Sequence, residues 1–202
     1  MDWATLMNRP AAYIDPARLA ACFGGTVTTA LCARLTATER LQERLSATIA
    51  EFYGLEAPVD LNTAAPDDRR VALTPPERSG DLARRAGAIF FANAIASAVR
   101  ADDVRRLRTR LGEALYTFAL ANRDLSGPTR ELVAGEGTDA IEEQGLRCVA
   151  AWCRSQPPAI GARVRLKSPP SAAIDRLETV IDIGPAKTVI VIGPAIVRRA
   201  AG

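Results

Sequence analysis

Apolar residues recur every three or four positions along most of the chain, the spacing that gathers them on one face of a helix. One predicted helix follows Thr36-Ala-Thr-Glu39, which fits a capping box. It ends before Gly54, where a C-terminal cap glycine is expected. Its predicted buried side consists of Leu41, Leu45, Ile49 and Phe52.

The same pattern predicts further helices. Asp15 followed by Pro16 is a good helix start, because an acidic N-cap precedes a proline at the first helical position. Helices are therefore expected over 16–23, 27–35, 79–99, from 102 or 103 through 118, from 138 or 139 through 152, and over 158–167. The clearest apolar stripe consists of Val104, Leu107, Leu111, Leu115 and Phe118.

Two segments depart from the helical pattern. Residues 55–78 hold four prolines and are expected to form a long loop. The β-branched runs 179–183 and 188–192 flank Gly184-Pro-Ala-Lys187 and fit a small hairpin, which would need cover from the helical body or a partner. The predicted fold is mainly α: a single domain of about six to eight helices over 1–170, and a tail over 171–202 that carries the hairpin.

The residues that most often perform chemistry are scarce. The chain has no histidine, the commonest general base and transition-metal ligand. Its four cysteines have no CxxC spacing, and buried free thiols in a reducing compartment are a better interpretation than a zinc site. The first residues do not resemble a secretory signal, and no apolar run approaches 18 residues. We expect a cytosolic chain with no catalytic, cofactor-binding or metal-binding residues.

The charge leaves two other functions open. The net charge is +3, and among 26 basic residues only Lys167 and Lys187 are lysines. A helical nucleic-acid-binding or regulatory protein is one alternative, which predicts strongly salt-dependent binding. A small enzyme with an unfamiliar site is the other, which predicts convergent carboxylates or a thiolate of lowered pKa. The residues proposed for nucleic-acid binding are Arg105, Arg106, Arg108 and Arg110.

Three stretches of the chain together resemble a known family. The first is Pro10–Leu19, and the second is Gly87–Ala96 with Leu111–Ala114 and Phe118–Leu125. The third comprises Gly145–Trp152, Gln156-Pro157 and Ala162–Lys167. In this order, over residues 8–168, they resemble the SctK (YscK-type) family of type III secretion systems. Asp15 stands where the family often has histidine, and the tail from Ser171 onward has no match.

The resemblance implies a mainly helical, non-enzymatic adaptor that works without cofactors. Such adaptors link the cytoplasmic domain of the inner-membrane ring protein SctD to pods of the SctQ protein, and act indirectly with the stator SctL and the ATPase SctN. The resemblance also implies a place at the cytoplasmic face of the inner membrane, held by protein contacts. Neither nucleic-acid binding nor direct membrane insertion is implied.

An adaptor needs at least two contact surfaces, and the sequence offers candidates for both. Tryptophan and arginine are enriched among the residues that dominate interface energies. The predicted tail strands are a further candidate, because a strand can add to a sheet edge in a partner. A purely structural role, with Trp152 in the core and the cations in water, is the alternative. The predicted partner-binding residues are Tyr13, Arg18, Trp152, Arg163, Arg165 and Lys167.

Overall fold

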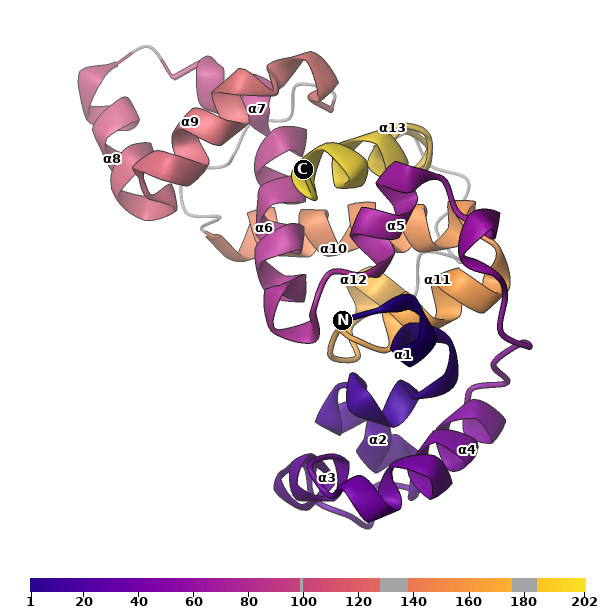
Figure 1. Cartoon of the computed structure of the whole chain (residues 1–202). Helices are drawn as coiled ribbons and strands as arrows, with labels where there is room; N and C mark the ends of the chain where they lie inside the picture. Colours follow the sequence, from indigo (N-terminus) through magenta and orange to yellow (C-terminus); the bar gives the residue numbers. More distant parts are fainter. Residues whose placement is uncertain (99, 128–137, 176–184) are drawn as a thin grey trace. The chain divides into compact units, whose positions relative to one another are not determined.

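The computed structural model describes residues 1–98, 100–127, 138–175 and 185–202. Within them the chain forms thirteen α-helices and no strand, so the prediction of a mainly α fold is confirmed (Figure 1). The expected count of six to eight helices is too low for two reasons. Two expected helices are each divided, and residues 3–8, 66–72, 172–175 and 185–200 form helices where none was expected. The division into a body over 1–170 and a tail over 171–202 stays a prediction.

The chain forms two compact units, each built from two separate stretches of sequence. Unit 1 comprises 1–79 and 153–171, and unit 2 comprises 80–152 and 172–202. The α-helices of unit 1 are α1 (Trp3–Asn8), α2 (Pro16–Cys22), α3 (Thr29–Thr36), α4 (Gln42–Phe52), α5 (Pro66–Ala72) and α11 (Pro158–Arg165). Its 3-10 helices are η1 (Pro10–Ala12), η2 (Glu39–Leu41), η3 (Leu61–Thr63) and η4 (Pro76–Arg78).

The helix ends of unit 1 follow local sequence signals. The Asp15 carboxylate accepts a hydrogen bond from the Ala17 N–H at 2.8 Å, which confirms the predicted start of α2. Helix α4 ends at Gly54, which has φ +58°. The Leu55 N–H then bonds the Ala50 carbonyl at 2.9 Å, as in a Schellman motif. The side chains that these helices bury include Leu6, Leu19, Ile49, Val71, Ile160 and Leu166.

Three expectations for unit 1 are wrong. The capping box is absent, because Thr36 closes α3 and α4 is preceded by η2 instead. Phe52 is 52% exposed and does not belong to the buried side of α4. The expected loop contains α5, which Pro66 begins at its first position. Acidic residues in its first turn and arginines in its last turn complement the helix dipole.

Unit 2 is built around the crossing of two helices with glycines at the contact. A Cβ added to Gly145 would lie 1.7 Å from the Ala83 carbonyl oxygen, and one added to Gly87 would lie 1.8 Å from that of Ile141. Only glycine allows the backbones this close. The α-helices of the unit are α6 (Ser79–Phe90), α7 (Ala92–Ala96), α8 (Ala101–Leu111), α9 (Glu113–Ala121), α10 (Thr138–Ser155), α12 (Ala172–Asp175) and α13 (Pro185–Ala200), with the 3-10 helix η5 (Arg123–Leu125).

Two predicted helices of unit 2 are divided. The helix expected over 79–99 breaks at Phe91 between α6 and α7. The apolar stripe from Val104 to Phe118 is interrupted at Gly112, whose φ of +80° ends α8, and α8 and α9 then lie side by side (Figure 1). The expected caps Asp102 and Asp103 lie inside α8, which begins after Arg100.

The predicted C-terminal hairpin is wrong. Its second strand, 188–192, lies in α13, while its first strand, 179–183, is outside the described residues. The side chains that α13 buries include Val189, Ile196 and Val197, a helical spacing, and Val191 is 70% exposed. Gly193 packs closely against Ala151 and Cys148 of α10, and this contact stabilises the helical conformation of α13. Tertiary burial therefore overrides the strand preference of β-branched residues.

Candidate interaction site

Arg163 is an internal cross-link of unit 1. It is 3% exposed and lies in the last turn of α11. Its guanidinium donates to three backbone carbonyls: Met7 at 3.0 Å, Ala159 at 2.8 Å and Glu56 at 2.9 Å. Burial lowers the pKa of this guanidinium. One side chain thus ties α11 to the end of α1 and to the segment after α4.

Lys167 forms a second cross-link. Its ammonium group donates to the carbonyl oxygens of Ala72 and Thr74 at the end of α5, and it lies 5.8 Å from the centre of the Tyr13 ring. The residue is 5% exposed. Removal of the ammonium group from water lowers its pKa to about 7, because a buried site disfavours the charged form.

Two further predicted contact residues complete this cluster. The Arg18 Nε donates to the Ser168 carbonyl at 2.6 Å, and the Tyr13 hydroxyl donates to the Leu6 carbonyl at 2.7 Å. Both residues are buried, and burial raises the pKa of the tyrosine. The structure therefore brings together Tyr13, Arg18, Arg163 and Lys167 inside unit 1.

The other two predicted residues differ in exposure. Trp152 is fully buried in α10, and Arg165 is half-buried near the end of α11. Direct partner contact by any of the six residues stays a prediction. Five of the six are buried in this structure, and Arg165 is partly exposed. A contact surface can also be built from other side chains of unit 1.

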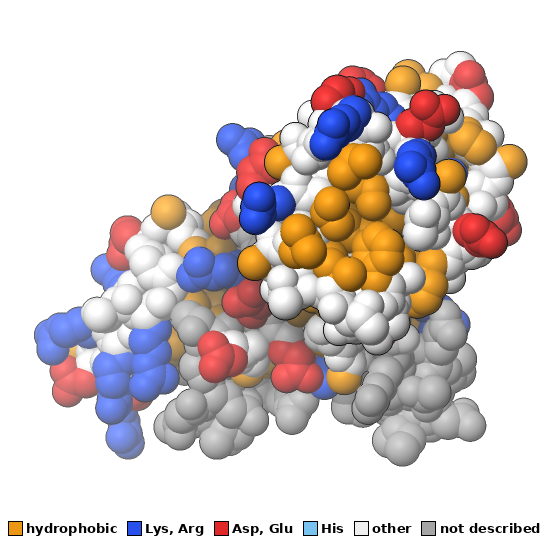
Figure 2. Space-filling view, turned by 90° about the horizontal axis from the view of Figure 1, so that it is seen from below, with side chains coloured by type: hydrophobic (Ala, Val, Ile, Leu, Met, Phe, Trp, Pro, Cys, Tyr) orange, Lys and Arg blue, Asp and Glu red, His pale blue; other side chains and the backbone are white. Residues whose placement is uncertain are grey.

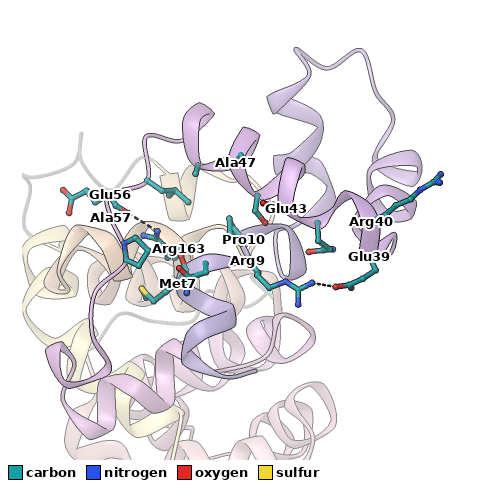
Figure 3. Close-up of a pocket in the computed structure, with 16 residues that line it drawn as sticks. Met7, Arg9, Pro10, Glu39, Arg40, Glu43, Ala47, Glu56, Ala57 and Arg163 are labelled. Carbon is teal, nitrogen blue, oxygen red and sulfur yellow. Dashed lines mark hydrogen bonds and ion pairs between the residues drawn. The ribbon is translucent and has the colours of Figure 1, made fainter.

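A groove in unit 1 offers such a surface. It has a volume of about 710 Å³ and lies between the end of α1, α4 and the segment 55–58 (Figure 3). Its lining is mixed, with small apolar side chains and charged ones. The residues that line it are Met7, Asn8, Arg9, Pro10, Glu39, Arg40, Gln42, Glu43, Ser46, Ala47, Ala50, Leu55, Glu56, Ala57, Pro58 and Arg163.

The charges of the groove are unevenly engaged. Arg9 pairs with Glu39 at 2.5 Å at one end, and the hydrogen-bonded Arg163 lies at the other (Figure 3). Arg40 points away from the groove in the same view. The carboxylate of Glu43 is exposed and has no ion pair within the described part of the chain. The groove therefore offers a free negative charge next to its apolar lining.

Gln42 adds an unsatisfied acceptor to this lining. Its side-chain amide donates to the Thr36 carbonyl, but its Oε1 is buried and receives no hydrogen bond. The residue is 6% exposed. A buried acceptor without a donor costs about 1–3 kcal/mol. No pattern in the sequence indicates this site, because its walls come from residues 7–10, 39–58 and 163, which only the fold brings together.

Figure 2 shows a second candidate surface, where apolar side chains gather over the part of unit 1 that holds α2, α3 and α4, with charged side chains around them. The exposed large apolar residues of these helices are Leu31, 44% exposed, and Phe52. Apolar surface gathered in this way is typical of contact sites between proteins.

The arginines proposed for nucleic-acid binding are largely neutralised. Arg105 and Arg106 pair with Asp102 and Asp103 at 3.0 and 2.5 Å, each three residues earlier on α8. Arg108 lies 3.6 Å from Glu113 and 5.1 Å from the centre of the Tyr116 ring. These contacts alternate positive and negative charge along the helix surface, which does not produce the focused basic face of a nucleic-acid binder.

The described residues show no site for a metal ion. No group of three or more Cys, Asp or Glu side chains is placed to hold one. The four cysteines, all within the described ranges, are free thiols. Burial raises the pKa of Cys148 and of Cys153 to about 12, which keeps both protonated. Among the described helices, none has the length and apolar character needed to cross a membrane.

The described residues form a helical protein that carries a groove of mixed lining and an apolar patch. Residues 4–187 match the family model described as YOP proteins translocation protein K (YscK). Because the match covers most of the chain, this protein belongs to the YscK family, the SctK family of type III secretion. It is therefore a type III secretion protein. No curated protein and no solved structure matches the chain.

Proposed function

We propose that this chain is a non-enzymatic adaptor of the type III secretion apparatus. It links the cytoplasmic domain of the inner-membrane ring protein SctD to the cytoplasmic pods of the SctQ-type protein, and it acts indirectly with SctL and SctN. The single observation that supports this proposal most is the family match over residues 4–187. In this proposal the chain stays at the cytoplasmic face of the inner membrane through protein contacts alone.

Two features of the structure support an adaptor. Unit 1 and unit 2 are each compact, so each is able to keep a surface for a different partner. Unit 1 also carries the groove and the apolar patch over α2, α3 and α4. An adaptor of this kind requires rigid contact surfaces and no chemistry.

Co-purification tests the proposal directly. The tagged chain is expressed with the SctQ-type protein and the SctD cytoplasmic domain from the same genome, and the complexes are isolated at low and high salt. We expect a stable complex with each partner separately and a ternary complex when both are present. A well-folded chain that forms neither complex would refute the adaptor function and favour nucleic-acid binding through α8.

The groove and the α2–α4 patch are then compared as contact surfaces. Ala47→Phe narrows the groove, and Leu31→Asp places a charge in an exposed position of α3. If the two surfaces hold different partners, each variant weakens one complex and spares the other. Far-UV circular dichroism and thermal melts of both variants control for unfolding.

A further inference from the structure

The groove of unit 1 has a chemistry that narrows what it binds. On the basis of the proposed function, we infer that it is a docking site for a protein segment that presents a lysine or arginine among apolar side chains. The apolar walls of the groove favour apolar side chains in the occupant, and its free negative charge favours a basic one (Figure 3).

The preference for apolar side chains comes from solvent-exposed side chains on a concave surface. Ala47, Ala57 and Pro58 are exposed, and Ala50 and Leu55 are half-buried. These side chains are short, so the groove has room for larger apolar side chains of an occupant. Burial of apolar surface gains about 25 cal/mol per Å², which favours such an occupant over water.

The preference for a basic side chain comes from which charges of the groove are already paired and which are free. Glu43 lies one helical turn before Ala47 on α4, and its carboxylate has no cation partner in the described part of the chain. Three cations are part of the lining. Arg9 and Arg163 are already held, by Glu39 and by backbone carbonyls, and the Arg40 side chain points away from the groove (Figure 3). A cationic side chain of an occupant would therefore meet an available carboxylate without displacing an existing ion pair.

Gln42 adds a second reason for a donor-bearing occupant. Its Oε1 is an acceptor that receives no hydrogen bond. The residue is only 6% exposed and lines the groove. Ammonium and guanidinium groups have donors and no acceptors, so they suit both Glu43 and Gln42.

The same charges disfavour other occupants. A nucleic acid or an anionic lipid surface would bring phosphate groups to the Glu43 carboxylate, and like charges repel. An acidic peptide would meet the same repulsion. The basic and apolar protein segment is the occupant that the lining satisfies in each respect.

Peptide selection on the intact chain tests this inference. A phage-displayed library of random peptides of about twelve residues is panned against the immobilised full-length protein. We expect the enriched sequences to combine at least one lysine or arginine with apolar residues. The most enriched peptide is then synthesised with a fluorescent label, and its dissociation constant is measured by anisotropy.

Charge variants locate the binding site. Glu43→Lys is expected to weaken the selected peptide by at least about tenfold. Glu51→Lys is the matched control, because Glu51 is an exposed residue of the same helix that does not line the groove, and it is expected to change the affinity less than about twofold. Ala47→Phe is expected to weaken binding by narrowing the groove. Thermal melts of all three variants exclude unfolding as the cause.

The outcomes separate this inference from the adaptor function. Enriched peptides without a basic residue, equal binding to the wild type and Glu43→Lys, or no enrichment at all would each overturn the inference. The adaptor function fails on a different result, namely the absence of wild-type complexes with the SctD domain and the SctQ-type protein. A chain that forms those complexes but selects no basic, apolar peptide retains its function and loses this assignment of the groove.

Discussion

The ammonium nitrogen of Lys167 lies 2.9 Å from the carbonyl oxygen of Thr74, deep inside unit 1. Its other acceptor is the Ala72 carbonyl, and no carboxylate pairs with it among the described residues. Carbonyl dipoles at the end of α5 compensate only part of the hydration that the ammonium loses. The position of this lysine therefore couples the proton concentration to the stability of the fold.

The stability of the protein is expected to rise with pH near neutrality. Lys167 has a pKa of about 7 in the fold and 10.5 as its reference value, so between these values the unfolded chain binds a proton that the folded chain lacks. The free energy of unfolding then increases by about 2 kcal/mol from pH 6 to pH 8.5. No histidine titrates in this range, because the chain has none. Urea denaturation followed by far-UV circular dichroism measures the slope.

Lys167→Met identifies the origin of this slope. The variant is less stable overall, because two carbonyls lose their donor, but its stability should vary much less between pH 6 and 8.5. Above about pH 9 the wild type should lose stability, since the raised pKa values of Tyr13 and the cysteines keep protons that the unfolded chain releases. An unchanged slope in Lys167→Met would assign the pH dependence to another group.

Arg163 and Arg165 should differ sharply in their effect on stability, although they lie two residues apart. Arg163→Met removes the donors of three carbonyls and is expected to destabilise unit 1 by about 3 kcal/mol or more. Arg165→Met removes a half-buried cation and is expected to cost less than about 1 kcal/mol. Urea midpoints of the two variants provide the comparison, and equal midpoints would contradict the cross-linking role of Arg163.

This difference also determines how partner contact by these cations is tested. Charge reversal at Arg163 would place a carboxylate against carbonyl oxygens and unfold unit 1. Arg165→Glu is the informative variant, since its side chain reaches solvent. Loss of one partner complex by a fully folded Arg165→Glu protein would support the predicted contact, and retention of both complexes would remove it.

Gly145 is expected to be essential for unit 2, whereas another helical glycine of the same unit is not. Gly145→Ala drives a methyl group into the Ala83 carbonyl and should destabilise the protein by about 3 kcal/mol. Gly80→Ala is the control, because its added Cβ meets nothing within 4 Å and alanine favours the helix by up to about 1 kcal/mol. Thermal melts that fall together for both variants would contradict the close packing of α6 and α10.

The paired arginines of α8 predict weak binding to nucleic acid. At about 150 mM salt we expect a short DNA duplex to bind no tighter than the micromolar to submillimolar range of non-specific complexes. Combined Asp102→Asn and Asp103→Asn substitutions release Arg105 and Arg106, and should strengthen binding several-fold. Fluorescence anisotropy at two salt concentrations measures both proteins. Tight wild-type binding that the double substitution leaves unchanged would revive the nucleic-acid hypothesis.

Local signals in the sequence predicted the fold where each helix carries its own cap or stripe. The Asp15-Pro16 start, the end at Gly54 and the helix from Thr138 to Ser155 all follow from neighbouring residues. The predictions failed where distant contacts decide. The run 188–192 has strand-forming residues, yet packing of α13 against α10 makes it helical. The apolar stripe from Val104 to Phe118 predicted one continuous helix across Gly112. The positive φ of Gly112 divides that helix into α8 and α9.

The candidate site was less accessible to sequence reasoning than the fold. Clustered cations looked like a contact surface, because nothing nearby in the sequence shows that Met7, Glu56 and Thr74 supply carbonyls for them. Hydrogen bonds from side chains to backbone carbonyls cannot be predicted from residue types, because every residue has a carbonyl. The groove was invisible for the same reason, since Glu43 is an unremarkable charge until the fold places it beside apolar walls.

The discontinuous construction of unit 1 affects how the protein is made and dissected. Residues 1–79 lack their Arg163 and Lys167 cross-links until residues 153–171 have left the ribosome, so unit 1 completes late in synthesis. Any fragment that ends before residue 171 carries an unfinished unit 1. C-terminal truncations that stop before Arg163 would then assign every partner of unit 1 to the C-terminal region, because each of these deletions removes the same cross-links. Point substitutions in the full chain are the reliable way to map its contacts.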